Sequence, residues 1–127
     1  MGERRLLTLT IPGRLPGLNE YTGACRTHPQ AGAKMKKDGE IKVGACILQQ
    51  LAGVRVAGPV KVNFIWTEKD NRRDPDNIAD FGTKVILDAL VEAQVIPDDS
   101  RKYIKGLYHD FDTDKNNPNI RVEIEEV

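Results

Sequence analysis

The stretch Asn71-Arg72-Arg73-Asp74-Pro75-Asp76-Asn77 separates a strand-like segment from the clearest helix-like segment of the chain. Before it, apolar and polar residues alternate over 60–67, which is typical of a half-buried strand. After it, residues 76–92 carry an apolar stripe so wide that it predicts a helix packed against a sheet. Asp74 or Asp76 can cap that helix. A strand followed by a helix is therefore expected around this stretch.

The remaining segments predict a small α+β fold. Residues 7–11 alternate as a strand, and the glycines and prolines of 12–33 predict a long loop. A second helix is expected over 34–52, with an apolar side formed by Met35, Ile41, Ala45, Leu48 and Ala52. Alternation over 103–111 and 120–125, around a turn rich in Asp and Asn, predicts a closing β-hairpin. We expect a single domain over 1–127, with a small mixed β-sheet of about four strands and two main helices packed on it, in the order β-α-β-α-β-β.

Length and composition indicate one globular domain. The chain has 127 residues, of which 39% are hydrophobic and 30% charged, a balance that excludes intrinsic disorder. No apolar run approaches the roughly 20 residues of a membrane span, and the N-terminus lacks the apolar core of a signal peptide, so we expect a cytoplasmic protein. Cys25 and Cys46 stand far apart with no histidine near either, which favours two reduced thiols over a zinc site.

The net charge is zero, but the charges are unevenly distributed along the chain. Residues 1–73 hold 13 Lys or Arg and 6 Asp or Glu, a balance of +7, whereas residues 74–127 hold 6 and 13, a balance of −7. A fold with a basic surface around an acidic pocket would suit a phosphodiester substrate and divalent cations. If the two halves intermingle in space, the charges cancel and no such surface forms.

The carboxylates of Asp74 and Asp76 are candidate ligands for a hard cation. Mg²⁺ prefers oxygen ligands and keeps several waters, so two or three carboxylates are enough. Asp99, in the pair Asp98-Asp99, is a candidate third ligand, but a helix of about 17 residues spans about 25 Å. The chain must therefore double back after the helix, or Asp99 must come from another subunit. Helix capping and turn formation are the alternative roles for these residues.

Three spaced motifs together resemble the RusA family of Holliday junction resolvases: Arg72-Arg73-Asp74-Pro75-Asp76-Asn77, Leu87-Asp88-Ala89-Leu90 and Ile96-Pro97-Asp98-Asp99. They span about residues 70–104. A strand ending in proline and a following segment with Asn19 and Tyr21 are also similar. The resemblance implies a homodimeric, Mg²⁺-dependent endonuclease, with Mn²⁺ as a substitute and no organic cofactor, that makes paired nicks at four-way DNA junctions in recombination and repair. Many members are encoded by phages and prophages.

The resemblance also implies roles for individual residues. Asp74, Asp76 and Asp99 match the family's essential acidic residues and would hold the metal, and Asn77 matches a position beside them. The family has a catalytic lysine four residues after the second aspartate, where this chain has Asp80. Lys84, one helical turn further on, is the candidate replacement. Alternatively, Asp80 adds a ligand, or Lys36 or Arg73 supplies the cation.

Three functions follow from these expectations. The first is a metal-dependent junction endonuclease whose phosphate contacts come from basic and polar residues near the acidic ones, namely Arg72, Arg73, Asn77, Lys36 and Lys37. The second is a protein that binds branched DNA and whose catalysis is weak or lost, because Asp80 replaces the family lysine. The third is a structural α+β domain in which the acidic pairs only cap and turn.

Overall fold

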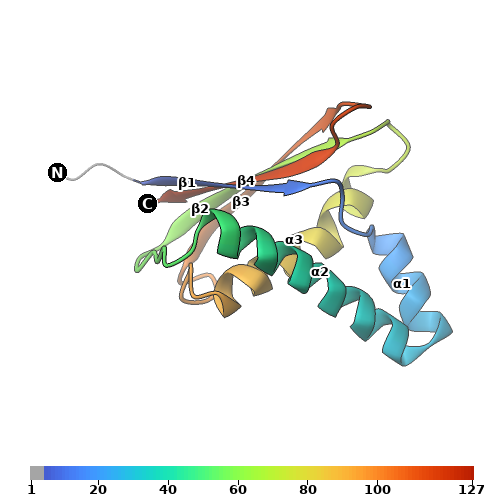
Figure 1. Cartoon of the computed structure of the whole chain (residues 1–127), viewed down its shortest axis with the longest axis horizontal. Coiled ribbons are helices and arrows are strands. Elements are labelled where there is room, and N and C mark those ends of the chain that lie inside the picture. The colour runs from blue at the N-terminus through green and yellow to red at the C-terminus, as the bar shows by residue number, and fades with distance from the viewer. Residues whose placement is uncertain (1–4) are drawn as a thin grey trace.

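The computed structural model describes residues 5–127, so the first residues, which entered the expectation of a cytoplasmic protein, lie outside it. The elements are β1 (Leu6–Pro12), α1 (Leu18–Thr27), α2 (Pro29–Gln50), β2 (Val60–Glu68), α3 (Pro75–Glu92), β3 (Ile104–Thr113) and β4 (Asn119–Glu126). The three helices lie on one face of the sheet (Figure 1). The α+β class, the four-stranded mixed sheet and the predicted order are confirmed. No helix within the described range is long and apolar enough to cross a membrane.

The sheet has the strand order β1-β4-β2-β3, so the predicted hairpin is wrong. β4 pairs antiparallel with both β1 and β2, whereas β3 pairs in parallel with β2 and does not pair with β4. The turn after β3 passes over the end of β2, where the Asp114 N–H donates to the Glu68 carbonyl at 2.8 Å. β4 takes a central position because its residues Ile120, Val122 and Ile124 are all buried. The more polar β3 remains at the edge.

The loop predicted over 12–33 is also wrong, because α1 and the start of α2 lie within it. Its glycines and prolines mark helix boundaries. Gly17 is the N-cap of α1, and Pro29 is the first residue of α2. Proline suits this position because a backbone N–H there would have no acceptor within the helix. Cys25 is therefore exposed on α1, while Cys46 is buried on α2, and both thiols are free.

The buried face of α2 differs from the predicted apolar side. Ile41 and Leu48 are 60% and 73% exposed, and the helix instead buries Gly32, Gly39, Val43, Cys46 and Ile47. At Gly39 a Cβ atom would lie 3.1 Å from Val85 Cγ1 of α3. The two helices thus approach closely where α2 has no side chain. A pattern of large apolar residues misses a packing face built on glycine.

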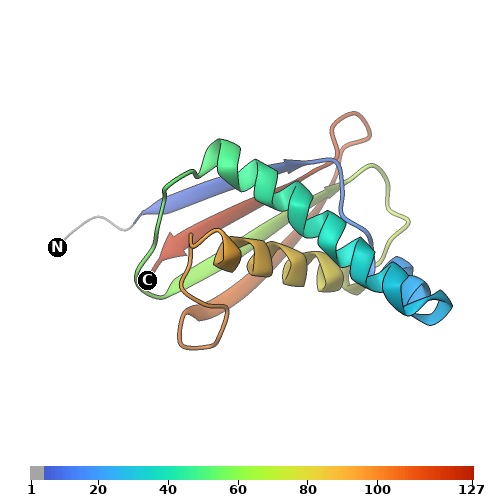
Figure 2. The same cartoon turned by 60° about the horizontal axis from the view of Figure 1, so that its bottom comes forward.

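The long helix α3 packs on β2 as predicted. Phe64 and Trp66 point from β2 into the core, and the Trp66 ring lies against Gly82, where a Cβ would come within 2.9 Å of it. The opposite edge of α3 carries Asp76, Asp80, Lys84 and Asp88, which are exposed or half-buried. Figure 2 shows α3 lying between α2 and the β3 edge of the sheet. This polar edge of α3 is therefore accessible to solvent, with Asp88 also within reach of Lys36 on α2.

Candidate active site

Asp74 and Asp76 lie at the start of α3, one residue apart. Asp74 is the N-cap residue, but its side chain makes no capping hydrogen bond. Asp76 Oδ1 accepts the backbone N–H of Asn77, at 2.9 Å. Within residues 5–127 neither carboxylate is in an ion pair, and both are exposed. The amino end of a helix favours negative charge. Two carboxylates available to a cation therefore sit on a rigid element.

Arg73 holds the backbone just before these carboxylates. Its Nε and Nη2 donate to the two carboxylate oxygens of Glu68 at 2.6 and 2.8 Å, and its Nη1 donates to the Leu15 carbonyl at 3.3 Å. The two charged side chains are only 15% and 11% exposed. A bidentate pair of this kind has a fixed geometry. The guanidinium of Arg73, a candidate phosphate ligand from the sequence, is thus engaged inside the protein.

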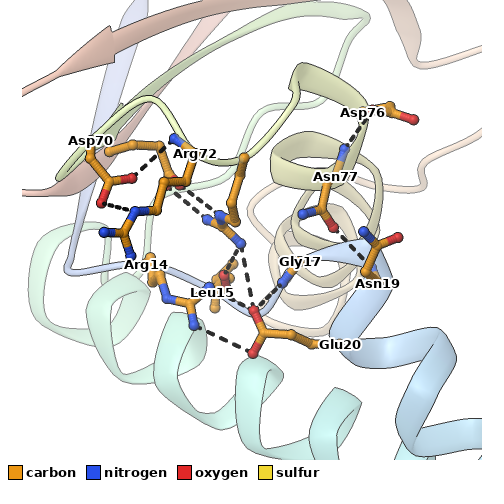
Figure 3. A network of polar contacts seen from close by, with 11 residues as sticks. Arg14, Leu15, Gly17, Asn19, Glu20, Asp70, Arg72, Asp76 and Asn77 are labelled. Carbon is orange, nitrogen blue, oxygen red and sulfur yellow. Dashed lines mark hydrogen bonds and ion pairs between the residues drawn. The ribbon is translucent and has the colours of Figure 1, made fainter.

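The ion pair extends to the start of α1 (Figure 3). Glu20 Oε1 lies 3.8 Å from Arg73 Nη1 and accepts both Arg14 Nη1 at 2.6 Å and the Gly17 N–H at 3.1 Å. Partial burial alone would raise the pKa of Glu20, but the hydrogen bonds from Arg14 and Gly17 outweigh it, so this pKa lies below its ordinary value. This network joins the loop after β1, α1 and the end of β2 beneath the start of α3.

Asn77 is the second link between α1 and α3. Its Oδ1 accepts the backbone N–H of Asn19 at 2.9 Å. The chain is tight at this point, since a Cβ on Gly17 would lie 2.6 Å from the same oxygen. Figure 3 shows Asn77 directed toward Asn19, with Asp76 on the other side. Asn77, a candidate DNA ligand from the sequence, positions the helix start through this hydrogen bond.

Lys84 lies in an ion-pair chain further along α3. Its Nζ donates to Asp88 Oδ1 at 2.9 Å and to Asp99 Oδ2 at 3.1 Å, and Lys36 Nζ of α2 lies 3.2 Å from Asp88 Oδ2. The hydrogen bonds to Asp88 and Asp99 raise the pKa of Lys84 above its ordinary value. Lys84 is therefore a cation at neutral pH, and its ammonium is already shared by two carboxylates.

The chain doubles back after α3 only as far as Lys84. Asp99 meets Lys84, which follows Asp76 by eight helical residues, or about 12 Å along the helix axis. Across the described part of the chain, no three His, Cys, Asp or Glu side chains gather closely enough to hold a metal. Asp74 and Asp76 thus lie together, while Asp99 lies apart from them.

A groove of about 470 Å³ lies beside the start of α3 and carries several cations. Its lining includes Arg14, Lys69, Arg72 and Arg73, together with Glu20, Glu68 and Asp70. Arg14 and Arg73 are paired with glutamates. Arg72 is largely exposed, and its only ion contact within the described range is to Asp70 at 3.6 Å. Lys69 and Arg72 are therefore the cations in this groove best placed to meet a phosphate, and the exposed Lys37 lies elsewhere, on α2.

The lysine pair around Asp88 predicts a pH-dependent contribution to stability. Partial burial alone would raise the pKa of Asp88, but hydrogen bonds from Lys84 and Lys36 lower it below 3.8. The stabilisation is therefore present above 3.8 and lost as the pH falls through the lowered pKa. We expect Asp88→Asn to lower the free energy of unfolding by about 1 kcal/mol at pH 7 and by much less near pH 2, as measured by urea titration.

Asp38→Asn is the matched control for this prediction. Asp38 pairs with Lys34 on the exposed side of α2, at 2.7 Å. An exposed pair contributes little, so its loss is expected to change stability by less than about 0.5 kcal/mol at either pH. Equal effects of the two substitutions at pH 7 would contradict the role given to Asp88.

The residues that form ion pairs with the candidate site residues were not predicted from the sequence. The strand predicted over 60–67 ends before Glu68, which lies at the end of β2 as the buried partner of Arg73. Glu20 lay in a predicted loop, although a glutamate three residues after Gly17 is a helix-start signal. No sequence signal links Lys36 to Asp88, because the contact depends on how α2 and α3 pack.

No model of a known protein family matches this chain, and no curated protein matches it either. The resemblance of residues 70–104 to the RusA family rests on the three motifs quoted above, in their order and spacing.

Proposed function

We propose that this protein is a metal-dependent endodeoxyribonuclease that resolves four-way DNA junctions by paired nicks. The observation that carries the proposal is the pair Asp74 and Asp76, two exposed carboxylates at the start of α3 with no ion-pair partner within residues 5–127. Lys69 and Arg72, in a groove of mixed charge beside them, support a phosphodiester substrate. The motifs that resemble the RusA family support a branched DNA rather than a linear one.

The donor chemistry of the site fits Mg²⁺, which takes oxygen ligands and retains waters. Asp74 and Asp76 would hold the ion, which supplies Lewis-acid stabilisation of charge on the phosphate and a more acidic water. The protein's own residues do the rest. Arg72 and Lys69 bind the phosphate backbone on one side of the carboxylates. Arg73 and Asn77 fix the start of α3, through Glu68 and Asn19, so that the two carboxylates keep one orientation.

The third carboxylate is proposed to come from a second copy of the chain. Within one chain, Asp99 is held at Lys84, about two helical turns from Asp76. A homodimer would supply Asp99 from the other copy and place two equivalent sites on opposed strands of a junction with near two-fold symmetry. Lys84 then orients Asp99 through its ammonium.

The proposed activity is tested with a synthetic four-way junction and Mg²⁺. The full chain is expected to convert the junction to nicked duplexes by symmetric cuts in two opposed strands, and to leave a linear duplex of the same arm sequence uncut. Chelation of divalent ions should stop the reaction, and Mn²⁺ should restore it. An intact junction under every divalent cation would rule out the nuclease.

One observation favours junction binding without cleavage as a second candidate. Lys84, the candidate replacement for the family lysine, is shared by Asp88 and Asp99, and Asp80 occupies the family's lysine position. If the protein shifts a four-way junction on a gel but does not nick it, this second function holds. Asp80→Lys is the informative variant, because it places an ammonium one turn from Asp76. Gain of nicking by Asp80→Lys would show that the missing cation limits catalysis.

A further inference from the structure

The outer edge of β3 has no partner strand among residues 5–127. β3 runs over ten residues at the end of the sheet and, within the described part of the chain, pairs with β2 alone. Its outer edge therefore presents a row of backbone N–H and C=O groups, which can template pairing with another strand. Figure 2 shows β3 at the margin of the sheet, with α3 beside it rather than across its edge.

The opposite edge of the sheet, at β1, is covered at its middle. The Thr10 N–H donates to Gln50 Oε1 at 2.8 Å, and Gln50 Nε2 donates to the Thr10 carbonyl at 2.7 Å. The end of α2 thus satisfies the outward-facing backbone groups in the middle of β1. A covered edge does not invite strand pairing. The two edges of this sheet differ, and only β3 is available over its length.

The β3 edge also carries apolar side chains that remain exposed. Leu107 and Phe111 are 41% and 42% exposed, and both lie on the face that the helices cover, since they align with Val62 and Trp66 of β2. His109 stands between them, opposite Phe64. Tyr108, on the other face, is also exposed. Edge strands of soluble proteins normally avoid such residues, so this row indicates a surface that is covered.

The charges along β3 favour one direction of pairing. Basic residues gather at its start, namely Arg101, Lys102 and Lys105, and acidic residues at its end, namely Asp110, Asp112 and Asp114. If two copies of this strand run antiparallel, the basic start of each lies beside the acidic end of the other. Parallel pairing would place like charges together, which is unfavourable. The segment is thus complementary to itself in the antiparallel sense.

We propose that two copies of this chain associate through β3, antiparallel and centred on His109, into one continuous eight-stranded sheet. Residues directly opposite in an antiparallel pair have their side chains on the same face of the sheet. In a two-fold symmetric pair this requires that one residue lie opposite its own copy, with the axis between the two copies. With His109 on the axis, Leu107 of each copy lies opposite Phe111 of the other. Direct pairs are then Tyr108 with Asp110, and Gly106 with Asp112, so no two carboxylates face each other.

The environment of His109 suits a position on the axis. Its Nδ1 accepts the Trp66 Nε1–H at 3.0 Å, and its ring lies 5.1 Å from that of Phe64. Burial lowers its pKa below the ordinary value, although Asp80 and Asp110 oppose this. Two histidines that meet on the axis are therefore uncharged at neutral pH and do not repel each other.

This inference deepens the proposed function by naming the interface of its homodimer. The first test is the mass of the full chain in solution, by sedimentation equilibrium without DNA or metal. The wild type is expected to be a dimer at micromolar concentration. Phe111→Lys should raise the dissociation constant of the dimer at least about a hundredfold. The effect is large because the two-fold interface contains the substituted residue of both copies. Since neither DNA nor metal is present, failure here is distinct from failure of the nuclease.

Leu48→Lys is the matched control, because Leu48 is an exposed large apolar residue of α2, at 73%. It should leave the dimer intact. A monomeric wild type, or a dimer that Leu48→Lys dissociates and Phe111→Lys does not, would overturn the proposal. Circular dichroism of each variant shows that it is folded, which is expected because both side chains are substantially exposed.

Cysteine pairing tests the register. In a Cys25→Ser background, Leu107→Cys and Phe111→Cys proteins are mixed and oxidised. Opposed residues have Cα atoms about 5 Å apart, which suits a disulfide, whereas the two Leu107 positions would lie about 13 Å apart along the strands. We expect crosslinks in the mixture and not in either protein alone. Crosslinks in the separate proteins, or none in the mixture, would contradict the register.

Discussion

Arg73→Met is expected to lower the free energy of unfolding by about 3 kcal/mol. The substitution keeps the apolar stem but leaves the carboxylate of Glu68, a buried residue, without its bidentate partner. An unpaired buried charge is strongly destabilising, whereas the intact pair itself contributes much less. Guanidinium titration at neutral pH measures the difference.

Arg72→Met provides the control for this result. Arg72 is adjacent in sequence, but its guanidinium is exposed, and its ion pair among the described residues is with Asp70, at 3.6 Å. Its loss should change stability by less than about 0.5 kcal/mol. Replacing both members of the pair, as Arg73→Met with Glu68→Leu, should recover most of the lost stability. Equal stabilities of the Arg72 and Arg73 variants would contradict the positioning role of Arg73.

Asp76→Asn is expected to slow junction cleavage at least about a thousandfold. Lewis-acid stabilisation of the phosphate is worth several kcal/mol, and each 1.36 kcal/mol is a factor of ten in rate. Asp76 is exposed and its Oδ1 accepts the N–H of Asn77, so the variant should remain folded and lose at most about 1 kcal/mol of stability at the helix amino end. A gel shift should show that it still binds the junction. Asp38→Asn removes an equal charge from the exposed side of α2 and should cleave normally; if it were as slow as Asp76→Asn, the loss would reflect overall charge.

The fold was predictable where side-chain periodicity and burial coincide. The alternation of Val62, Phe64 and Trp66 and the apolar stripe of α3 both follow from local sequence, and both are buried as expected. The pairing of β3 with β2 was not predictable, because alternation defines a strand but not its neighbour. The packing face of α2 was not predictable, because Gly39 has no side chain and so lets Val85 of α3 approach the backbone of α2 closely.

The candidate site was predictable as a list of residues and less so as an arrangement. Asp74 and Asp76 lie together because they are neighbours in sequence at a helix start. Asp99 and Lys84 meet through the path of residues 93–98, which no sequence pattern specifies. Arginine is a residue type that often binds phosphate, but the role of Arg73 is set by its ion pair with Glu68, five residues away at the end of a strand.

The most direct test of a shared site is to mix two inactive variants. Asp76→Asn and Asp99→Asn should each fail to nick a four-way junction. If each site takes Asp74 and Asp76 from one copy and Asp99 from the other, a mixed dimer carries both substitutions in one site and none in the other. The mixture is then predicted to regain nicking of a single strand per junction. A mixture as inactive as its parents, under conditions where subunits exchange, would contradict the account.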